Sequence, residues 1–269
     1  MSKQVYYDDV KIIKKPLNKR VRDFLKFFCV VVVIVMCFVG AGYLSKALTV
    51  GNLGAVIVYG STTKKLNANV RYAVTLGEYE DKTEAEQVAL GSSVQGASGY
   101  VWHGDKYYVI GSVYSTREDA EKVLRNLQES KYNTSIIEIR YDKATLDLSM
   151  YENSDMRVVD ESIGIWDDVY QCIYDYSISF DKGEISHLAV SSGLSNIRGK
   201  VKAIIVDLQN LINKNTSKLS YVQSALIKLD EILDEAILKT IDNTATNYTL
   251  RYALVNVVDI EYEMRSQLV

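Results

Sequence analysis

The sequence predicts an α+β protein with a transmembrane helix, a small mixed domain and a helical bundle. An uncharged apolar run lies near the N-terminus, β-forming residues and two short helical patterns follow it, and the rest shows only helical periodicity. We therefore divide the 269 residues into a basic tail (1–23), a transmembrane helix (24–46), a linker (47–68), a mixed domain (69–142) and a helical domain (143–269).

The apolar run, residues 27–44, is eighteen residues long and contains no charged side chain. Extended back to Phe24, it can cross a hydrocarbon core of roughly 30 Å at about 1.5 Å per residue. Residues 1–26 hold eight Lys or Arg against three Asp. The positive-inside rule therefore predicts a cytoplasmic N-terminus and extracytoplasmic domains. The alternative is a signal peptide cleaved after Ala47, against which the long basic region and the length of the run argue.

The mixed domain reads as a β-α-β-β-α-β pattern. Alternating β-branched and aromatic residues predict strands at 70–79, 100–103, 106–114 and 135–141. Helices are expected at 81–94, with Thr83 and Glu86 as a capping box, and from Ser115 to about residue 130. Gly104 and Asp105 form a short hairpin turn. Two helices on one side of a four-stranded antiparallel sheet make the split βαβ arrangement.

Two segments of this domain carry family motifs, YAVTLGEYEDKTEAEQVA from Tyr72 and KYYVIGSVYSTREDAEKVLRNL from Lys106. They resemble the two halves of a SPOR domain, the sporulation-related repeat of bacterial cell-envelope proteins. The residues that keep the family frame are Val74, Leu76, Gly77, Tyr79, Tyr107, Val109, Tyr114 and 118–121. The chain departs from the family pattern at Thr75, Glu78, Tyr108, Ser112 and Val113.

The resemblance implies binding to peptidoglycan, with a preference for glycan strands stripped of stem peptides, at division septa. If Val74, Leu76 and Tyr79 face the helices, strand alternation turns Arg71, Ala73 and Thr75 away from them, onto the other face of the sheet. Aromatic rings beside hydrogen-bonding groups suit sugar rings. The alternative is that the tyrosines are ordinary strand residues. The predicted glycan-binding site on that face consists of Arg71, Thr75, Tyr100, Trp102, Tyr108 and Ile110.

The sequence predicts neither an enzyme nor a cofactor. The two histidines, His103 and His187, are far apart and have no companion ligands at metal-binding spacing. Adjacent acidic pairs such as Asp160 and Glu161 are more simply solvated charges than a glycosidase pair. The three cysteines form neither a disulfide framework nor a metal motif. We therefore expect a non-catalytic protein without cofactor or metal.

Residues 143–269 carry apolar side chains at spacings of three and four, the period of amphipathic helices. Breaks are expected at 181–183, 213–217 and 242–247, with Gly193 or Gly199 splitting the second segment. Four helices with short loops predict an antiparallel bundle or long hairpins. We interpret the leucine stripes as core, the alternative being a surface for self-association or for a partner.

These features predict a single-pass protein of the bacterial cell membrane that binds septal peptidoglycan and acts in cell division or sporulation. Its helical domain would contact division or sporulation proteins. Residues 143–269 hold twelve Lys or Arg against nineteen Asp or Glu, which argues against nucleic acid as a partner. The alternative is an envelope adaptor whose SPOR-like domain no longer binds glycan and which works through protein contacts of its helical domain. An RNA-binding module would need a basic sheet and a cytosolic address, and the sequence predicts neither.

Overall fold

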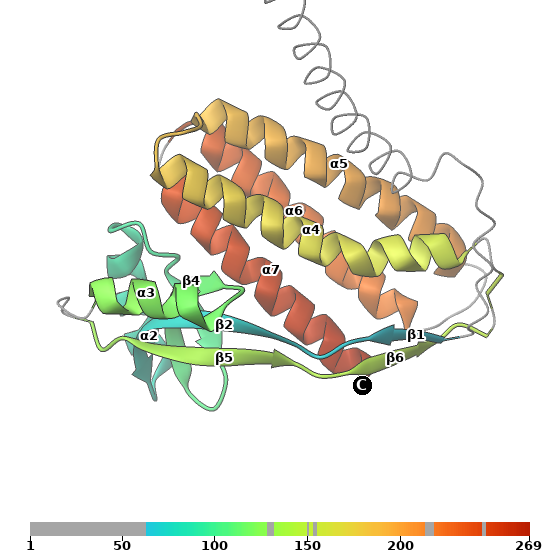
Figure 1. Cartoon of the computed structure of the whole chain (residues 1–269), viewed down its shortest axis with the longest axis horizontal. Coiled ribbons are helices and arrows are strands. Elements are labelled where there is room, and N and C mark those ends of the chain that lie inside the picture. The colour runs from blue at the N-terminus through green and yellow to red at the C-terminus, as the bar shows by residue number, and fades with distance from the viewer. Residues whose placement is uncertain (1–62, 128–131, 150, 153–154, 213–217, 244–245) are drawn as a thin grey trace, which may run out of the picture. The chain divides into compact units, whose positions relative to one another are not determined.

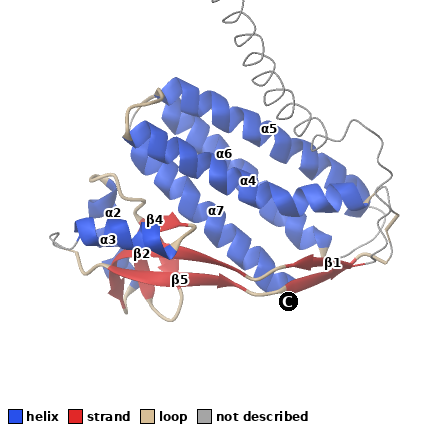
Figure 2. Ribbon diagram, viewed as in Figure 1, coloured by secondary structure: helices blue, strands red, loops and turns tan. Residues whose placement is uncertain are grey.

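The mixed domain contains a four-stranded antiparallel sheet with strand order β3-β4-β2-β5. The computed structural model describes residues 63–127, 132–149, 151–152, 155–212, 218–243 and 246–269. The sheet (Figure 2) and the helices after it confirm the predicted α+β class. The strands are β2 (Asn69–Tyr79), β3 (Tyr100–His103), β4 (Tyr107–Tyr114) and β5 (Ser135–Tyr141).

The predicted tail and transmembrane helix, and most of the linker, lie outside the described residues. Among the helices that are described, none combines the length and apolar character that crossing a membrane requires.

Two helices, α2 (Lys82–Ser93) and α3 (Arg117–Leu127), cover one face of the sheet. The capping box predicted at Thr83 is wrong, because the Asp81 side chain accepts the Glu84 N–H at 3.0 Å and starts α2 two residues earlier. At α3 the Thr116 hydroxyl accepts the Asp119 N–H at 3.2 Å. Beneath the two helices the sheet buries Leu76, Val109, Val74 and Tyr114.

A two-stranded antiparallel ribbon, β1 (Thr63–Leu66) with β6 (Ala144–Asp147), flanks the sheet. This corrects the prediction that only helices follow residue 142. Four residues in each strand are too few to give a periodicity signal. Burial of Leu66 and Leu146 in the common core holds the ribbon in place.

The second half of the chain forms four long helices, as predicted. They are α4 (Met156–Asp181), α5 (His187–Ile212), α6 (Leu219–Ile241) and α7 (Thr246–Leu268). The expected break at Gly193 or Gly199 is wrong, since α5 is continuous. The Tyr176 ring of α4 lies so close to Gly193 that any side chain there would collide with it. That glycine therefore permits close helix packing.

Helix α7 joins the sheet to the bundle (Figure 1). It packs against β3, β4, β5 and β6 on one side and against α4 and α6 on the other. One hydrophobic core runs from Ala73 and Ile110 in the sheet to Leu229 and Leu233 in α6. The described residues therefore belong to one compact unit, and the predicted boundary after residue 142 falls inside it.

Gly99 lies where α2 approaches the start of β3 closely. Its φ is +59°, and a Cβ there would lie 2.8 Å from the Ala89 carbonyl oxygen. We expect Gly99→Ala to lower the free energy of unfolding by about 1–3 kcal/mol. The control is Gly91→Ala in α2, where a Cβ meets nothing within 4 Å and the change should add about 0.5–1 kcal/mol. Chemical denaturation measures both, and equal effects would contradict the assignment.

Candidate functional site

The structure places the six predicted glycan contacts on the sheet face opposite α2 and α3, where the helical bundle lies. Ile110 and Trp102 belong to the large core shared with the bundle, and Tyr100 and Tyr108 pack against that core. Trp102 pairs with Tyr108, and Tyr100 with Ile110, across the β3–β4 ladder. The bundle thus occupies most of the surface that the sequence analysis assigned to glycan.

Helix α7 contacts two of these six residues, Tyr100 and Trp102, and a third, Ile110, lies in the core that the sheet shares with the bundle. The Tyr100 hydroxyl donates a hydrogen bond to the Asp259 carboxylate. The Trp102 ring meets the Tyr262 ring edge-on, with centroids 5.3 Å apart, and Trp102 is 7% exposed. Ile110 is fully buried. Aromatic pairs of this geometry contribute about 0.5–1.5 kcal/mol beyond area burial, so these contacts hold α7 on the sheet.

Arg71 and Thr75 are also occupied within the protein. Arg71 Nη2 lies 2.7 Å from Asp167 Oδ1 of α4, and its guanidinium carbon lies 3.9 Å from the centre of the Tyr170 ring. The Thr75 hydroxyl lies 2.7 Å from that of Ser135 on β5. Both residues are buried. Arg71 Nε has no hydrogen-bond partner, but it is buried and does not face a ligand.

Part of the face stays open as a hollow of about 270 Å³ beside α7. Tyr108 lies in it half-buried, and its hydroxyl donates to Asp105 Oδ1 at 2.7 Å. This hydrogen bond is the main cause of the raised Tyr108 pKa and the lowered Asp105 pKa. The hollow therefore combines aromatic edges with the Asp105 carboxylate. Glu138 and Arg140 line it from β5, but the Glu138 carboxylate pairs with Arg117 of α3, on the other face of the sheet. Its lining residues are Trp102, Gly104, Asp105, Tyr108, Ile137, Glu138, Ile139, Arg140 and Tyr262.

Sequence reasoning missed Tyr262 and the β5 residues of this hollow, which we call the aromatic cleft. Tyr262 lies between helix positions identified as apolar core, Ile260 and Met264, and is 40% exposed. Its place beside Trp102 depends on how α7 docks, and the sequence contains no signal for that. Glu138 and Arg140 could be found only by pairing β5 with β2, because the cleft spans the sheet.

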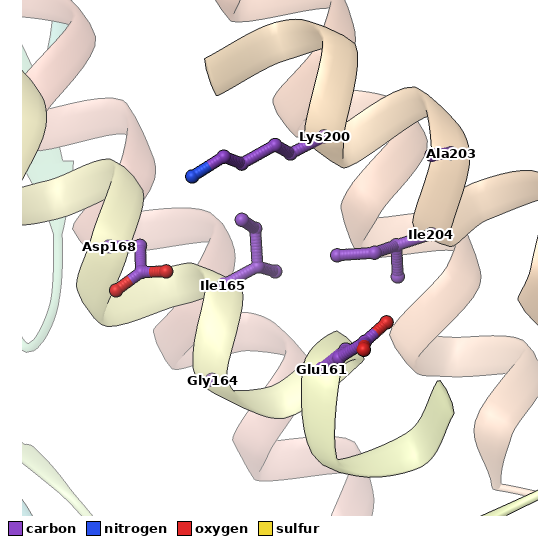
Figure 3. Close-up of a pocket in the computed structure, with 7 residues that line it drawn as sticks. All are labelled: Glu161, Gly164, Ile165, Asp168, Lys200, Ala203 and Ile204. Atoms are coloured by element: carbon purple, nitrogen blue, oxygen red, sulfur yellow. The ribbon is translucent and has the colours of Figure 1, made fainter. Parts of the chain in front are cut away.

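A second hollow, of about 400 Å³, lies between α4 and α5. Figure 3 shows Ile165 and Ile204 at its centre, with Glu161 and Asp168 on α4 and Lys200 on α5 around them. A Cβ built at Gly164, which also lines it, meets nothing within 4 Å. We interpret this hollow as a packing gap left by small residues. Within the described ranges, no group of three or more His, Cys, Asp or Glu is arranged to hold a metal ion.

Comparison with known proteins gives no relative: no protein-family model, no curated protein and no solved structure matches this chain. Function must therefore be argued from the residues and their geometry.

The contact between α7 and the sheet contains a half-buried carboxylate, Asp259, and a buried one, Glu261. Burial is the largest cause of the raised pKa of Asp259, partly offset by its hydrogen bond with Tyr100. Burial likewise raises the pKa of Glu261, although Arg265 lies 2.9 Å away and acts in the opposite direction. A raised carboxyl pKa means that the folded state binds the proton more tightly than the unfolded state. Ionisation of these two carboxyl groups therefore lowers the free energy of unfolding as pH rises above the ordinary carboxyl pKa.

The Asp259→Asn variant tests the predicted direction of this pH dependence. We expect the variant to unfold with a free energy up to about 1 kcal/mol higher than the parent protein near pH 7, a modest gain because Asp259 keeps some contact with solvent. The difference should vanish near pH 3, below the ordinary pKa of Asp, because both states of the parent are then protonated. Denaturant titrations at several pH values measure it. A difference that does not depend on pH, or a loss of stability at pH 7, would contradict the assignment.

Proposed function

We propose that the protein is a non-catalytic, single-pass membrane protein of the bacterial cell envelope that binds peptidoglycan glycan through the aromatic cleft. The observation that carries this proposal is the cleft itself, where the rings of Trp102, Tyr108 and Tyr262 lie beside the Asp105 carboxylate and strand β5. Flat apolar rings suit the C–H faces of sugars, and a carboxylate and a tyrosine hydroxyl suit their hydroxyls. The resemblance of residues 70–141 to a SPOR domain supports the same ligand class.

Membrane attachment, and a role in division or sporulation septa, belong to this proposal. They rest on the apolar run at residues 27–44, its basic flank and the SPOR resemblance. The cleft is smaller than the six-residue face expected from the sequence, so we propose a contact with a short stretch of glycan.

A second candidate is an envelope adaptor that does not bind glycan and works through protein contacts. The burial of Arg71, Thr75 and Ile110 favours it, because these positions on the sheet face are used by the protein's own core. The two candidates differ in one measurable property, which is whether the purified chain binds glycan.

The test is a Tyr108→Ala, Tyr262→Ala double variant of the full-length chain, assayed by co-sedimentation with purified peptide-free glycan strands. Each aromatic contact contributes about 1 kcal/mol, so we expect binding to weaken roughly 10- to 30-fold. Tyr262 also packs against Trp102, so Tyr108→Ala is assayed alone as well, and chemical denaturation checks that each variant is folded. Trp102 is unsuitable for this test, because truncating a buried Trp costs about 3–5 kcal/mol of stability.

The matched control is Tyr221→Ala on α6, a tyrosine that is 47% exposed and does not line the cleft. It should bind glycan like the parent chain. Unchanged glycan binding by the double variant would contradict the assignment of the aromatic cleft as the glycan-binding site. A parent chain that does not sediment with glycan would support the adaptor.

A further inference from the structure

Strand β3 is an open edge of the sheet. Within the described part of the chain its strand neighbour is β4, and no other strand pairs with it. Bonded and non-bonded pairs alternate along an antiparallel ladder, and the bond from the Gly104 N–H to the Lys106 carbonyl, 2.9 Å long, sets their phase. The backbone N–H and C=O groups of Val101 and His103 therefore point away from β4. They form a short template for another strand.

A groove of about 430 Å³ runs beside this edge, between α2 and the first half of α7. The α2 wall presents Ala89 and Leu90, of which Leu90 is 73% exposed. The other wall is a row of three tyrosines, Tyr248 and Tyr252 of α7 and Tyr100 of β3. The ring centroids of Tyr100 and Tyr252 are 5.7 Å apart, as are those of Tyr252 and Tyr248. We call this the edge groove, and its lining residues are Lys82, Glu86, Ala89, Leu90, Ser93, Gly99, Tyr100, Val101, Tyr248 and Tyr252.

The opposite edge of the sheet is protected in a way that β3 is not. Strand β5 carries Glu138 and Arg140, which pair with each other, and Glu138 also pairs with Arg117. Charged side chains on an edge strand discourage pairing with another chain. The β3 sequence, YVWH, contains no Lys, Arg, Asp, Glu or Pro. Beside it Leu90 and Val94, 73% and 86% exposed, leave an apolar surface uncovered.

The charges of the edge groove indicate what kind of partner it fits. Its two charged residues, Lys82 and Glu86, form an ion pair with each other, Nζ to Oε1 3.3 Å, and leave no net charge for a ligand to match. The complementary surface is therefore uncharged. A backbone template between a helix wall with exposed Leu90 and a wall of tyrosine rings matches an extended polypeptide whose side chains alternate between the two walls.

We propose that the edge groove binds an extended, uncharged peptide segment of a partner protein, which adds as a fifth strand along β3. Side chains on one side of the added strand contact Leu90, and those on the other contact Tyr100, Tyr248 and Tyr252. The groove shares no lining residue with the aromatic cleft, so this inference goes beyond the proposed glycan binding and is independent of it. It also gives Tyr100, one of the predicted glycan contacts, a different role.

The first test uses the full-length chain and a fluorescein-labelled probe peptide in which valine and tyrosine alternate with threonine, with lysine at each end for solubility. Fluorescence anisotropy should show saturable binding. Leu90→Lys places a charge in the groove at an exposed site, and we expect it to weaken binding by at least roughly tenfold. The matched control is Val206→Lys on α5, 61% exposed and outside the groove, which should bind the probe like the parent chain.

The second test addresses the backbone of β3. Val101→Pro removes an N–H group that the sheet does not use, so the fold should persist while probe binding is lost. Val101→Thr keeps the N–H and a similar shape, and should retain binding. Hydrogen exchange should show the amides of Val101 and His103 protected only when the probe is bound.

Three results would overturn the proposal. The first is a parent chain that does not bind the probe, and the second is probe binding that survives both Leu90→Lys and Val101→Pro. The third is self-association of the chain that Leu90→Lys abolishes, because a second copy would then be the occupant. Glycan sedimentation by Leu90→Lys should equal that of the parent chain, so failure of either proposal leaves the other testable.

Discussion

The contact between α7 and the sheet determines how the described part of this protein is organised. Trp102 against Tyr262, and Tyr100 against Asp259, join the two halves of the chain across 159 or more residues of sequence. Around these contacts one apolar core extends from the sheet into the bundle. The sheet therefore has helices on both faces, α2 and α3 on one and α7 on the other. A surface that would be open in a mixed domain standing alone is mostly interior here, and its aromatic residues contribute to packing.

This arrangement limits where ligands can bind. Helix α7 crosses the face and leaves two hollows that share no residue, the aromatic cleft near Trp102 and the edge groove near Val101. The first offers aromatic edges with the Asp105 carboxylate, and the second a free strand edge beside exposed Leu90 and three tyrosine rings. A polymer of sugars and an extended peptide would use these different surfaces. One chain could then connect a wall polymer with a protein partner while its N-terminal segment holds it at the membrane, as we propose.

Local patterns were enough to predict most of the elements. Alternation in residues 70–79 and 135–141, and three–four spacing beyond residue 155, are set by which side chains each element buries, and these patterns are visible in the sequence. The short β1–β6 ribbon was missed because its stability comes from Leu66 and Leu146 packing in the core. Gly193 was expected to interrupt a helix, but it lies inside α5 and makes room for the Tyr176 ring of α4, which the sequence does not show. At the candidate site, strand alternation grouped the six residues on one face of the sheet, the face opposite α2 and α3. It could not reveal that α7 covers this face, because docking is decided by contacts far apart in sequence.

The most direct test of the account is the solvent accessibility of Trp102. The chain has two tryptophans, and Trp166→Phe leaves Trp102 as the only one. The replacement is compatible with the fold because the Trp166 indole N–H is buried without a hydrogen-bond partner. Acrylamide quenching of the remaining fluorescence then reports whether α7 covers the sheet. The account predicts weak quenching in the folded chain that becomes strong only on unfolding. Strong quenching of Trp102 in the folded chain would contradict it.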